Sequence, residues 1–105
     1  MRFYIYILYS TSSDRYYVGQ SHDPHARLKD HNTGDRPNQQ SKYTFKHRPW
    51  ELKASFCLGE ERSLTIQVER YIKRQKSRKF IEQLIDFQED LAQIAQLLRV
   101  PVYRD

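Results

Sequence analysis

The sequence has little of what disulfide, zinc or membrane proteins need. Its 105 residues include one cysteine, Cys57, so no intramolecular disulfide can form. There is no HExxH motif and no CxxC pair, which argues against a zinc site, and the three glycines stand apart, which argues against a Walker-type phosphate loop. No apolar run reaches membrane-spanning length, and the start, MRFYIYILYS, is too short and too tyrosine-rich to be a signal peptide. We therefore expect a cytoplasmic protein that does not contact a membrane.

Positive charge, in contrast, is abundant and unevenly distributed. The formal net charge is +5, with 16 Lys and Arg against 8 Asp and Glu in residues 1–81 but 2 against 5 in residues 82–105. Two acid-free basic stretches stand out, RPNQQSKYTFKHR at 36–48 and RYIKRQKSRK at 70–79. Basic clusters with interspersed aromatic residues suit a polyanion, because cations displace the counterions of phosphates and rings stack on bases. The pattern favours a nucleic-acid partner, with a solvated basic face as the alternative.

The hydrophobic pattern predicts one α/β domain over residues 1–105. Asp23 followed by Pro24 is typical of a helix start, because Asp caps the helix and Pro fits its first turn. The stretch 35–49 has no periodicity and is interpreted as a long basic surface loop, whereas 50–58 alternates apolar and polar residues as a half-buried strand does. The expected order is ββαβαα, with strands over 3–10, 15–21 and 50–58 and helices over 24–32, 60–75 and 78–98.

The last of these helices carries an apolar stripe with spacings of three and four residues. Its members are Leu84, Phe87, Leu91, Ile94 and Leu98. Such a stripe packs on the core of its own domain or forms an interface with a partner. Core packing is the preferred interpretation, and a homodimer or another protein bound through this helix is the alternative.

Three polar residues could carry chemistry. Arg27 and His31 lie four residues apart and so share a helix face, where an arginine fork suits a phosphate and a histidine can move protons. Glu69 is the only acid between residues 62 and 81, and it could hold Mg²⁺, which accepts few protein oxygens. Each has a simpler interpretation: a solvent-facing pair for Arg27 and His31, and an ion pair with Lys73 for Glu69.

Several segments taken together resemble one enzyme family. YIY stands at 4–6 and YVG at 17–19, followed by RLKDHN at 27–32, KYTFKHRPWEL at 42–52 and VERYIKRQKSRKFIEQLI at 68–85. Their order and spacing resemble the GIY-YIG nucleases, most of all the small single-domain bacterial members, over residues 3 to about 86. Tyrosines in strands are usually packing residues. The resemblance is what singles out two of the eight, Tyr6 and Tyr17.

The resemblance implies a small three-stranded antiparallel sheet flanked by helices, and metal-dependent hydrolysis of DNA phosphodiester bonds. By position, Tyr6 and Tyr17 fall on the tyrosines of the two motifs, Arg27 on the essential arginine and Glu69 on the metal-binding glutamate. His31 stands where the family has a histidine or a tyrosine. The implied cofactor is one Mg²⁺ or Mn²⁺ ion. Tyr6 is the first choice for the group that orients or deprotonates the attacking water, with Tyr17 and His31 as competing bases.

Contacts to nucleic acid are expected from the residue after YVG and from the two basic stretches. The candidates are Gln20, Lys42, Lys46, Arg48, Arg70, Lys73, Arg74 and Lys76. Because the length leaves no room for a separate sequence-reading domain, we expect weak sequence specificity and a choice of DNA by shape, ends, branches or single strands.

Three departures from the family pattern are visible. Tyr4 replaces the glycine of the first motif, Val18 replaces the isoleucine of the second, and SRKFIEQ at 77–83 lacks an asparagine that some members have there. Residues 87–105 lie beyond the resemblance. The alternatives to an active nuclease are a nucleic-acid-binding module that has lost turnover and an interaction protein that uses its C-terminal helix.

Overall fold

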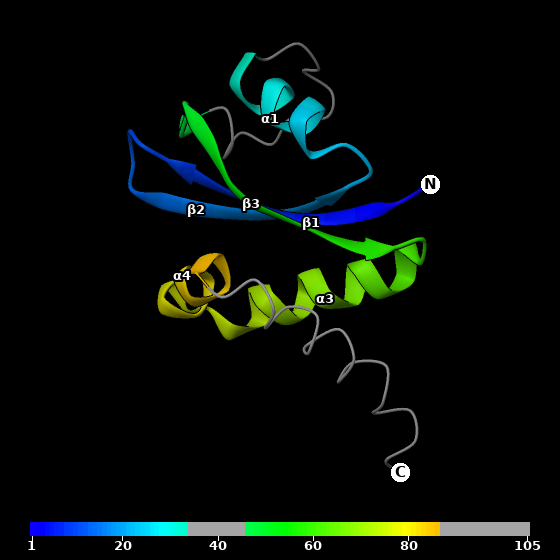
Figure 1. Ribbon diagram of the computed structural model, residues 1–105. Coiled ribbons are helices and arrows are strands. Elements are labelled where there is room, and N and C mark those ends of the chain that lie inside the picture. The colour runs from blue at the N-terminus through cyan, green and yellow to red at the C-terminus, as the bar shows by residue number, and fades with distance from the viewer. Residues whose placement is uncertain (34–45, 87–105) are drawn as a thin grey trace.

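The computed structural model describes residues 1–33 and 46–86 of the chain (Figure 1). The expected order ββαβαα is confirmed. The last helix is described as far as Asp86, so its expected continuation to residue 98 lies outside the described residues, as does most of the basic stretch 35–49. The elements are β1 (Phe3–Ser10), β2 (Arg15–Ser21), α1 (Pro24–Thr33), β3 (Trp50–Gly59), α3 (Arg62–Gln75) and α4 (Arg78–Asp86).

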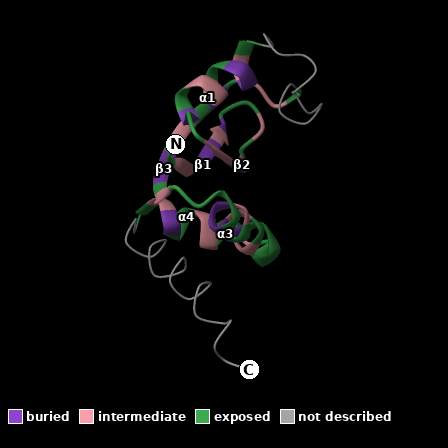
Figure 2. Ribbon diagram, turned by 90° about the vertical axis from the view of Figure 1, so that its right-hand side faces the viewer, coloured by how far each residue is buried: buried purple, intermediate pink, exposed green. Residues whose placement is uncertain are grey.

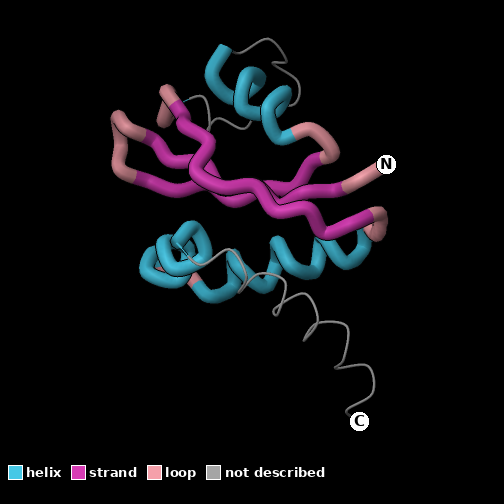
Figure 3. The backbone as a smooth tube through the Cα atoms, viewed as in Figure 1, coloured by secondary structure: helices cyan, strands magenta, loops and turns pink. Residues whose placement is uncertain are grey.

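The three strands form one antiparallel sheet in the order β2-β1-β3. Helix α1 covers one face of the sheet and α3 and α4 cover the other, as Figures 1 and 3 show from one side and Figure 2 from another. The central strand β1 therefore lies between two helical layers. Four successive residues of β1, 5–8, are almost completely buried, as expected for a strand that packs on both faces.

Alternation along β1 builds two separate cores. Ile5 and Ile7 point to the α3 and α4 side, where they pack with Val68, Ile72 and other apolar residues. Tyr6 and Leu8 point to the α1 side, in a smaller cluster with Trp50. Because successive side chains of a strand alternate between faces, Tyr6 is directed toward α1 by its position in the sequence.

The predicted alternation of burial in the third strand is confirmed, but its apolar residues do not all share one face. The partners of Ile7 and Leu8 on β3 are Ala54 and Leu52, so Lys53 is an extra residue in β3 at this point. Such a bulge shifts the side-chain phase of a strand by one position. Leu52 consequently packs in the cluster beside α1, whereas Ala54 packs in the cluster between the sheet and α3.

The helix starts expected from the sequence are capped as predicted. The carboxylate of Asp23 accepts a hydrogen bond of 3.1 Å from the backbone N–H of Ala26, and the hydroxyl of Ser77 accepts one of 3.1 Å from the N–H of Phe80. Of the apolar stripe in the last helix, Leu84 is buried in the core, in agreement with core packing; its members from Phe87 onward lie outside the described residues. Within the described part of the chain, no helix is both long and apolar enough to cross a bilayer.

Candidate active site

The hydroxyl of Tyr6 is the centre of a polar cluster on the α1 face of the sheet. The Tyr6 side chain is only 1% exposed, and its Oη lies 3.2 Å from Nε2 of His31 on α1. The rings of Tyr17, from β2, and His31 lie 6.3 and 6.2 Å from the Tyr6 ring, measured between centroids, and 5.1 Å from each other. The two motif tyrosines and the histidine therefore meet at one place.

Gly19 makes room for this arrangement. It is the β2 partner of Tyr6 across the antiparallel pair, and the Tyr6 ring lies over it. A Cβ at position 19 would be 2.5 Å from both Cζ and Oη of Tyr6, well inside van der Waals contact. The glycine of YVG is therefore required by the close approach of the tyrosine ring to the backbone.

Charges around Tyr6 connect it to the remaining site residues. Burial raises the pKa of Tyr6 to about 12, with Tyr17 and Glu69 adding to the rise, whereas a hydrogen bond and the charge of the Arg27 guanidinium oppose it. The phenol is thus protonated at neutral pH. Four residues affect the Tyr6 hydroxyl by charge or hydrogen bonding, and they come from β2, α1 and α3: Tyr17, Arg27, His31 and Glu69.

His31 is a buried neutral base. Its side chain is 2% exposed, and burial together with the charge of Arg27 lowers its pKa to about 4, against a smaller opposing effect of Asp30. The ring therefore carries one proton at neutral pH, and one of its nitrogens is free to accept. The simpler interpretation of Arg27 and His31 as a solvent-facing pair is wrong, because α1 directs His31 into the sheet.

Glu69 approaches the site from α3, beside the edge of β2. Its carboxylate is 19% exposed and accepts a hydrogen bond of 2.9 Å from Nζ of Lys73, so the ion pair expected from the i,i+4 spacing is present. Nζ of Lys73 also lies 5.6 Å above the ring of Tyr17. The pair is consequently part of the cluster, and the ion-pair interpretation does not conflict with a site at Tyr17.

The carboxylate that lies beside Tyr17, on Glu69, could hold a metal ion. Residues 1–33 and 46–86 hold no group of three or more His, Cys, Asp or Glu placed to bind a metal together. That donor set does not suit zinc, but it fits Mg²⁺ or Mn²⁺, since these ions take one or two protein carboxylates and complete their shells with water and substrate phosphate. Glu69 is the residue of the cluster that fits this requirement.

The residues predicted to contact nucleic acid lie in several different elements of the described chain. Gln20 and Arg27 line a cavity of about 410 Å³ together with His22 and Arg62. Arg48 is directed to the backbone, with Nη1 donating a hydrogen bond of 3.2 Å to the carbonyl of Asn32. Lys42 lies outside the described residues. The other candidates are exposed: Lys46, Arg70, Lys73, Arg74 and Lys76.

Sequence reasoning missed residues that hold the cluster in place. Asp30 is buried, and its Oδ2 lies 3.9 Å from Nη1 of Arg27, a pair that the i,i+3 spacing could have indicated. The amide of Asn32 forms two hydrogen bonds with the backbone of Trp50, donating to its carbonyl at 2.9 Å and accepting from its N–H at 2.6 Å. This joins α1 to the start of β3. No short motif signals such a contact across 18 residues of sequence.

Comparison with known proteins agrees with this geometry. The sequence model of one protein family, the GIY-YIG catalytic domain, matches residues 2–82 of the chain. No curated protein and no solved structure matches the chain. The family match covers most of the sequence, includes every element described here except the end of α4, and is consistent with the three-stranded sheet and its three helices. The chain therefore belongs to the GIY-YIG family, and its domain is a phosphodiester-cleaving enzyme of the endonuclease type with DNA as its implied substrate.

Proposed function

We propose that the protein is a Mg²⁺- or Mn²⁺-dependent endonuclease that cuts DNA with weak sequence specificity. The observation that supports this most is the meeting of Tyr6, Tyr17 and His31 at one place. The Glu69–Lys73 ion pair lies beside the Tyr17 ring, and the charge of Arg27 acts on the Tyr6 hydroxyl. A protein that only bound DNA would need the basic surface, but it would not need a lone carboxylate among cations beside two tyrosines. Within the family we place the chain with the small single-domain bacterial members.

Arg27 and Glu69 supply the electrostatic part of the proposed mechanism. The guanidinium of Arg27 binds the scissile phosphate and neutralises the charge that develops on its oxygens, which is usually the main contribution to phosphoryl transfer. Glu69 would hold the divalent ion, whose charge polarises the phosphate and stabilises the leaving oxygen. The Glu69 carboxylate also accepts a hydrogen bond of 2.9 Å from Nζ of Lys73, which adds positive charge beside it.

Tyr6 and His31 act on the attacking water. With a pKa of about 12, Tyr6 is a protonated phenol, so it cannot remove a proton unless it gives up its own. Neutral His31 lies 3.2 Å away through Nε2 and can accept that proton. The water therefore loses a proton to Tyr6 Oη as Tyr6 donates to His31. The ring of Tyr17 packs against the rings of Tyr6 and His31 and keeps them in position.

The proposal is tested by cleavage of supercoiled plasmid, single-stranded and branched DNA with Mg²⁺ or Mn²⁺. Arg27→Ala and Glu69→Gln should each lower the rate by about 10²–10³-fold, the usual effect of removing one such electrostatic group. Matched controls remove the same charges elsewhere: Arg2→Ala and Glu60→Gln, both at exposed positions, should cut like the wild type. Circular dichroism melting shows whether each variant is folded.

The alternatives predict other results. Cleavage that survives both Arg27→Ala and Glu69→Gln would show that the assigned site is wrong. DNA binding without cleavage of any substrate would favour a binding module that has lost turnover. Capture of a protein partner through the C-terminal helix, with no binding of DNA, would favour an interaction protein.

A further inference from the structure

A second cavity adjoins the cluster on the opposite side from Arg27. It has a volume of about 490 Å³ and opens between β2, the end of α3 and the start of α4. Its apolar wall includes Val18, Ile72 and Ile81, and Arg15 and Lys76 bring positive charge to it. Such a volume and an apolar lining with a few polar groups are typical of sites for small organic groups.

Two residues belong to both the cavity and the cluster. Tyr17 and Lys73 line the cavity, and Lys73 also pairs with Glu69 while lying over the Tyr17 ring. The cavity therefore begins where the proposed metal ligand and the second motif tyrosine are found. A strand of DNA with its scissile phosphate at Arg27 and Tyr6 would pass this opening with its next nucleotide.

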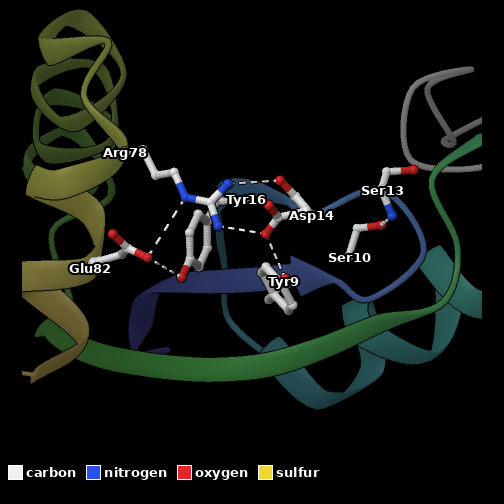
Figure 4. A network of polar contacts seen from close by, with 7 residues as sticks. All are labelled: Tyr9, Ser10, Ser13, Asp14, Tyr16, Arg78 and Glu82. Carbon is white, nitrogen blue, oxygen red and sulfur yellow. Dashed lines mark hydrogen bonds and ion pairs between the residues drawn. The ribbon is translucent and has the colours of Figure 1, made fainter.

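The outer wall of the cavity is held in a fixed position by a polar network (Figure 4). Arg78, the first residue of α4, donates hydrogen bonds of 2.9 and 2.5 Å to the carbonyl and carboxylate of Asp14 in the β1–β2 turn. Its Nε lies 3.7 Å from Glu82, and its guanidinium lies 5.2 Å from the centroid of the Tyr16 ring. Tyr9 also donates to the Asp14 carboxylate, at 2.6 Å.

This network has two consequences for a ligand. It fastens α4 to the turn, so the cavity is formed before a ligand arrives and little ordering is needed on binding. In the network, Arg78 forms ion pairs with Asp14 and Glu82. Because the Arg78 charge offsets that of the Asp14 carboxylate, Asp14 repels an anion in the cavity less strongly. Arg15 and Lys76 are then the cations that a phosphate at the cavity would meet.

We propose that this cavity receives the base of an unpaired nucleotide next to the scissile phosphate. The inference rests on the proposed function, which places that phosphate at Arg27 and Tyr6. Apolar and aromatic walls with cations beside them match a nucleotide, whose base is flat and apolar on its faces and whose phosphate is anionic. In a duplex the base is paired and stacked, so it must be extruded at a cost of a few kcal/mol before it can enter. The enzyme therefore prefers single-stranded, frayed or branched DNA to an intact duplex.

The backbone at Lys76 makes glycine a suitable substitution for testing the role of its side chain. Lys76 ends α3 in the left-handed conformation, with φ of 49°, where glycine is the favoured residue. A lysine is less favourable than glycine in this conformation, because its Cβ crowds the backbone. Lys76→Gly should therefore relieve strain and weaken DNA binding at the same time, a combination that loss of folding cannot produce.

The first test measures binding in EDTA, where no cleavage occurs, by fluorescence anisotropy with three labelled probes. These are an oligothymidylate, its duplex with oligoadenylate, and a strand of equal length with abasic sugars at every position. We expect the oligothymidylate to bind about tenfold more tightly than either other probe, since stacking one base on an aromatic site changes affinity by about that factor. Equal affinity for strand and duplex, or for the thymidylate and abasic strands, would overturn the inference.

The second test locates the base and uses a matched control. An oligonucleotide with 5-iodouracil should photocross-link to the peptide that contains Tyr16 and Tyr17; cross-links found only elsewhere would contradict the placement. Lys76→Gly should weaken binding of the oligothymidylate several-fold without lowering the thermal midpoint, whereas Lys79→Ala, which removes an equal charge three residues away, should weaken it less. Equal effects of the two variants would also overturn the inference. Cleavage of duplex and single strand at the same rate would leave the proposed function intact and reject only this pocket.

Discussion

Gly19→Ala is the substitution whose effect the structure defines most sharply. The added Cβ would lie 2.5 Å from Cζ and Oη of Tyr6 and 3.0 Å from Cε1. Normal carbon contacts are about 3.5–4.0 Å, so the ring must move by about 1 Å. Tyr6 is 1% exposed, lies between α1 and the sheet and is hydrogen-bonded to His31, so it has no free space in which to move.

The expected magnitudes follow from this displacement. Overpacking of a close-packed site costs about 1–3 kcal/mol, which corresponds to a fall of roughly 5–20 °C in the thermal midpoint of a domain of this size. A shift of about 1 Å in a catalytic group costs on the order of a hundredfold in rate. Gly19→Ala should therefore lose both stability and cleavage activity, measured by thermal unfolding and by plasmid cleavage below the midpoint.

Gly59→Ala is the matched control. Gly59, at the end of β3, has φ of +90°, and a Cβ there would meet no atom within 4 Å. Its substitution should cost about 1–2 kcal/mol through backbone strain alone and leave the cleavage rate of the folded protein unchanged. If Gly19→Ala were as active and as stable as the wild type, or if the two alanine variants lost activity equally, the assignment of Gly19 as the space for the Tyr6 ring would be refuted.

Three further predictions concern single groups of the site. Tyr6→Phe keeps the packing of the ring but removes Oη. The rate of cleavage should fall by more than about a hundredfold, while the free energy of unfolding changes by about 1 kcal/mol. Cleavage at the wild-type rate would show that Tyr6 is not part of the mechanism. The pKa of His31 is about 4 in the folded protein against an ordinary 6.5, so the unfolded chain binds more protons between these values and stability is lost as the pH falls through that range. At pH 5 the loss should be about 2 kcal/mol relative to pH 7 in urea unfolding, and it should be absent from His31→Gln; parallel curves for the two proteins would contradict it. Asp23→Ala removes the N-terminal cap of α1 and should lower the free energy of unfolding by about 1 kcal/mol, measured by urea unfolding. An unchanged free energy of unfolding would contradict this assignment.

The order of the elements could be predicted, and candidate site residues could be named, because both depend on local sequence. The Asp23-Pro24 step marks the start of α1, and strands are marked by the tyrosine- and isoleucine-rich run at 3–10 and by alternation at 50–58. The order and spacing of YIY, YVG, Arg27 and Glu69 resemble those of the family. Each of these signals depends on residues close together in the chain or on their linear order. Even the ion pair of Glu69 with Lys73 follows from a helical spacing of four residues.

Tertiary structure decided the chemical state of the site. Arg27 and His31 share a helix face, but only packing of α1 on the sheet shows that His31 is buried, neutral and in contact with Tyr6. The high pKa of Tyr6 has the same origin, since burial is a property of both layers around β1 and not of any one segment.

Two features that position the site were likewise outside the reach of the sequence. The bulge at Lys53 divides the apolar residues of β3 between two cores, although their spacing in the sequence is unbroken. The cavity beside Tyr17 is lined by Arg78 and Asp14, which are 64 residues apart in the sequence and hydrogen-bonded to each other. Sequence periodicity determined which elements form and which residues are candidates. The contacts between distant elements determined which of those residues meet, how far water is excluded from them and which protonation states they hold.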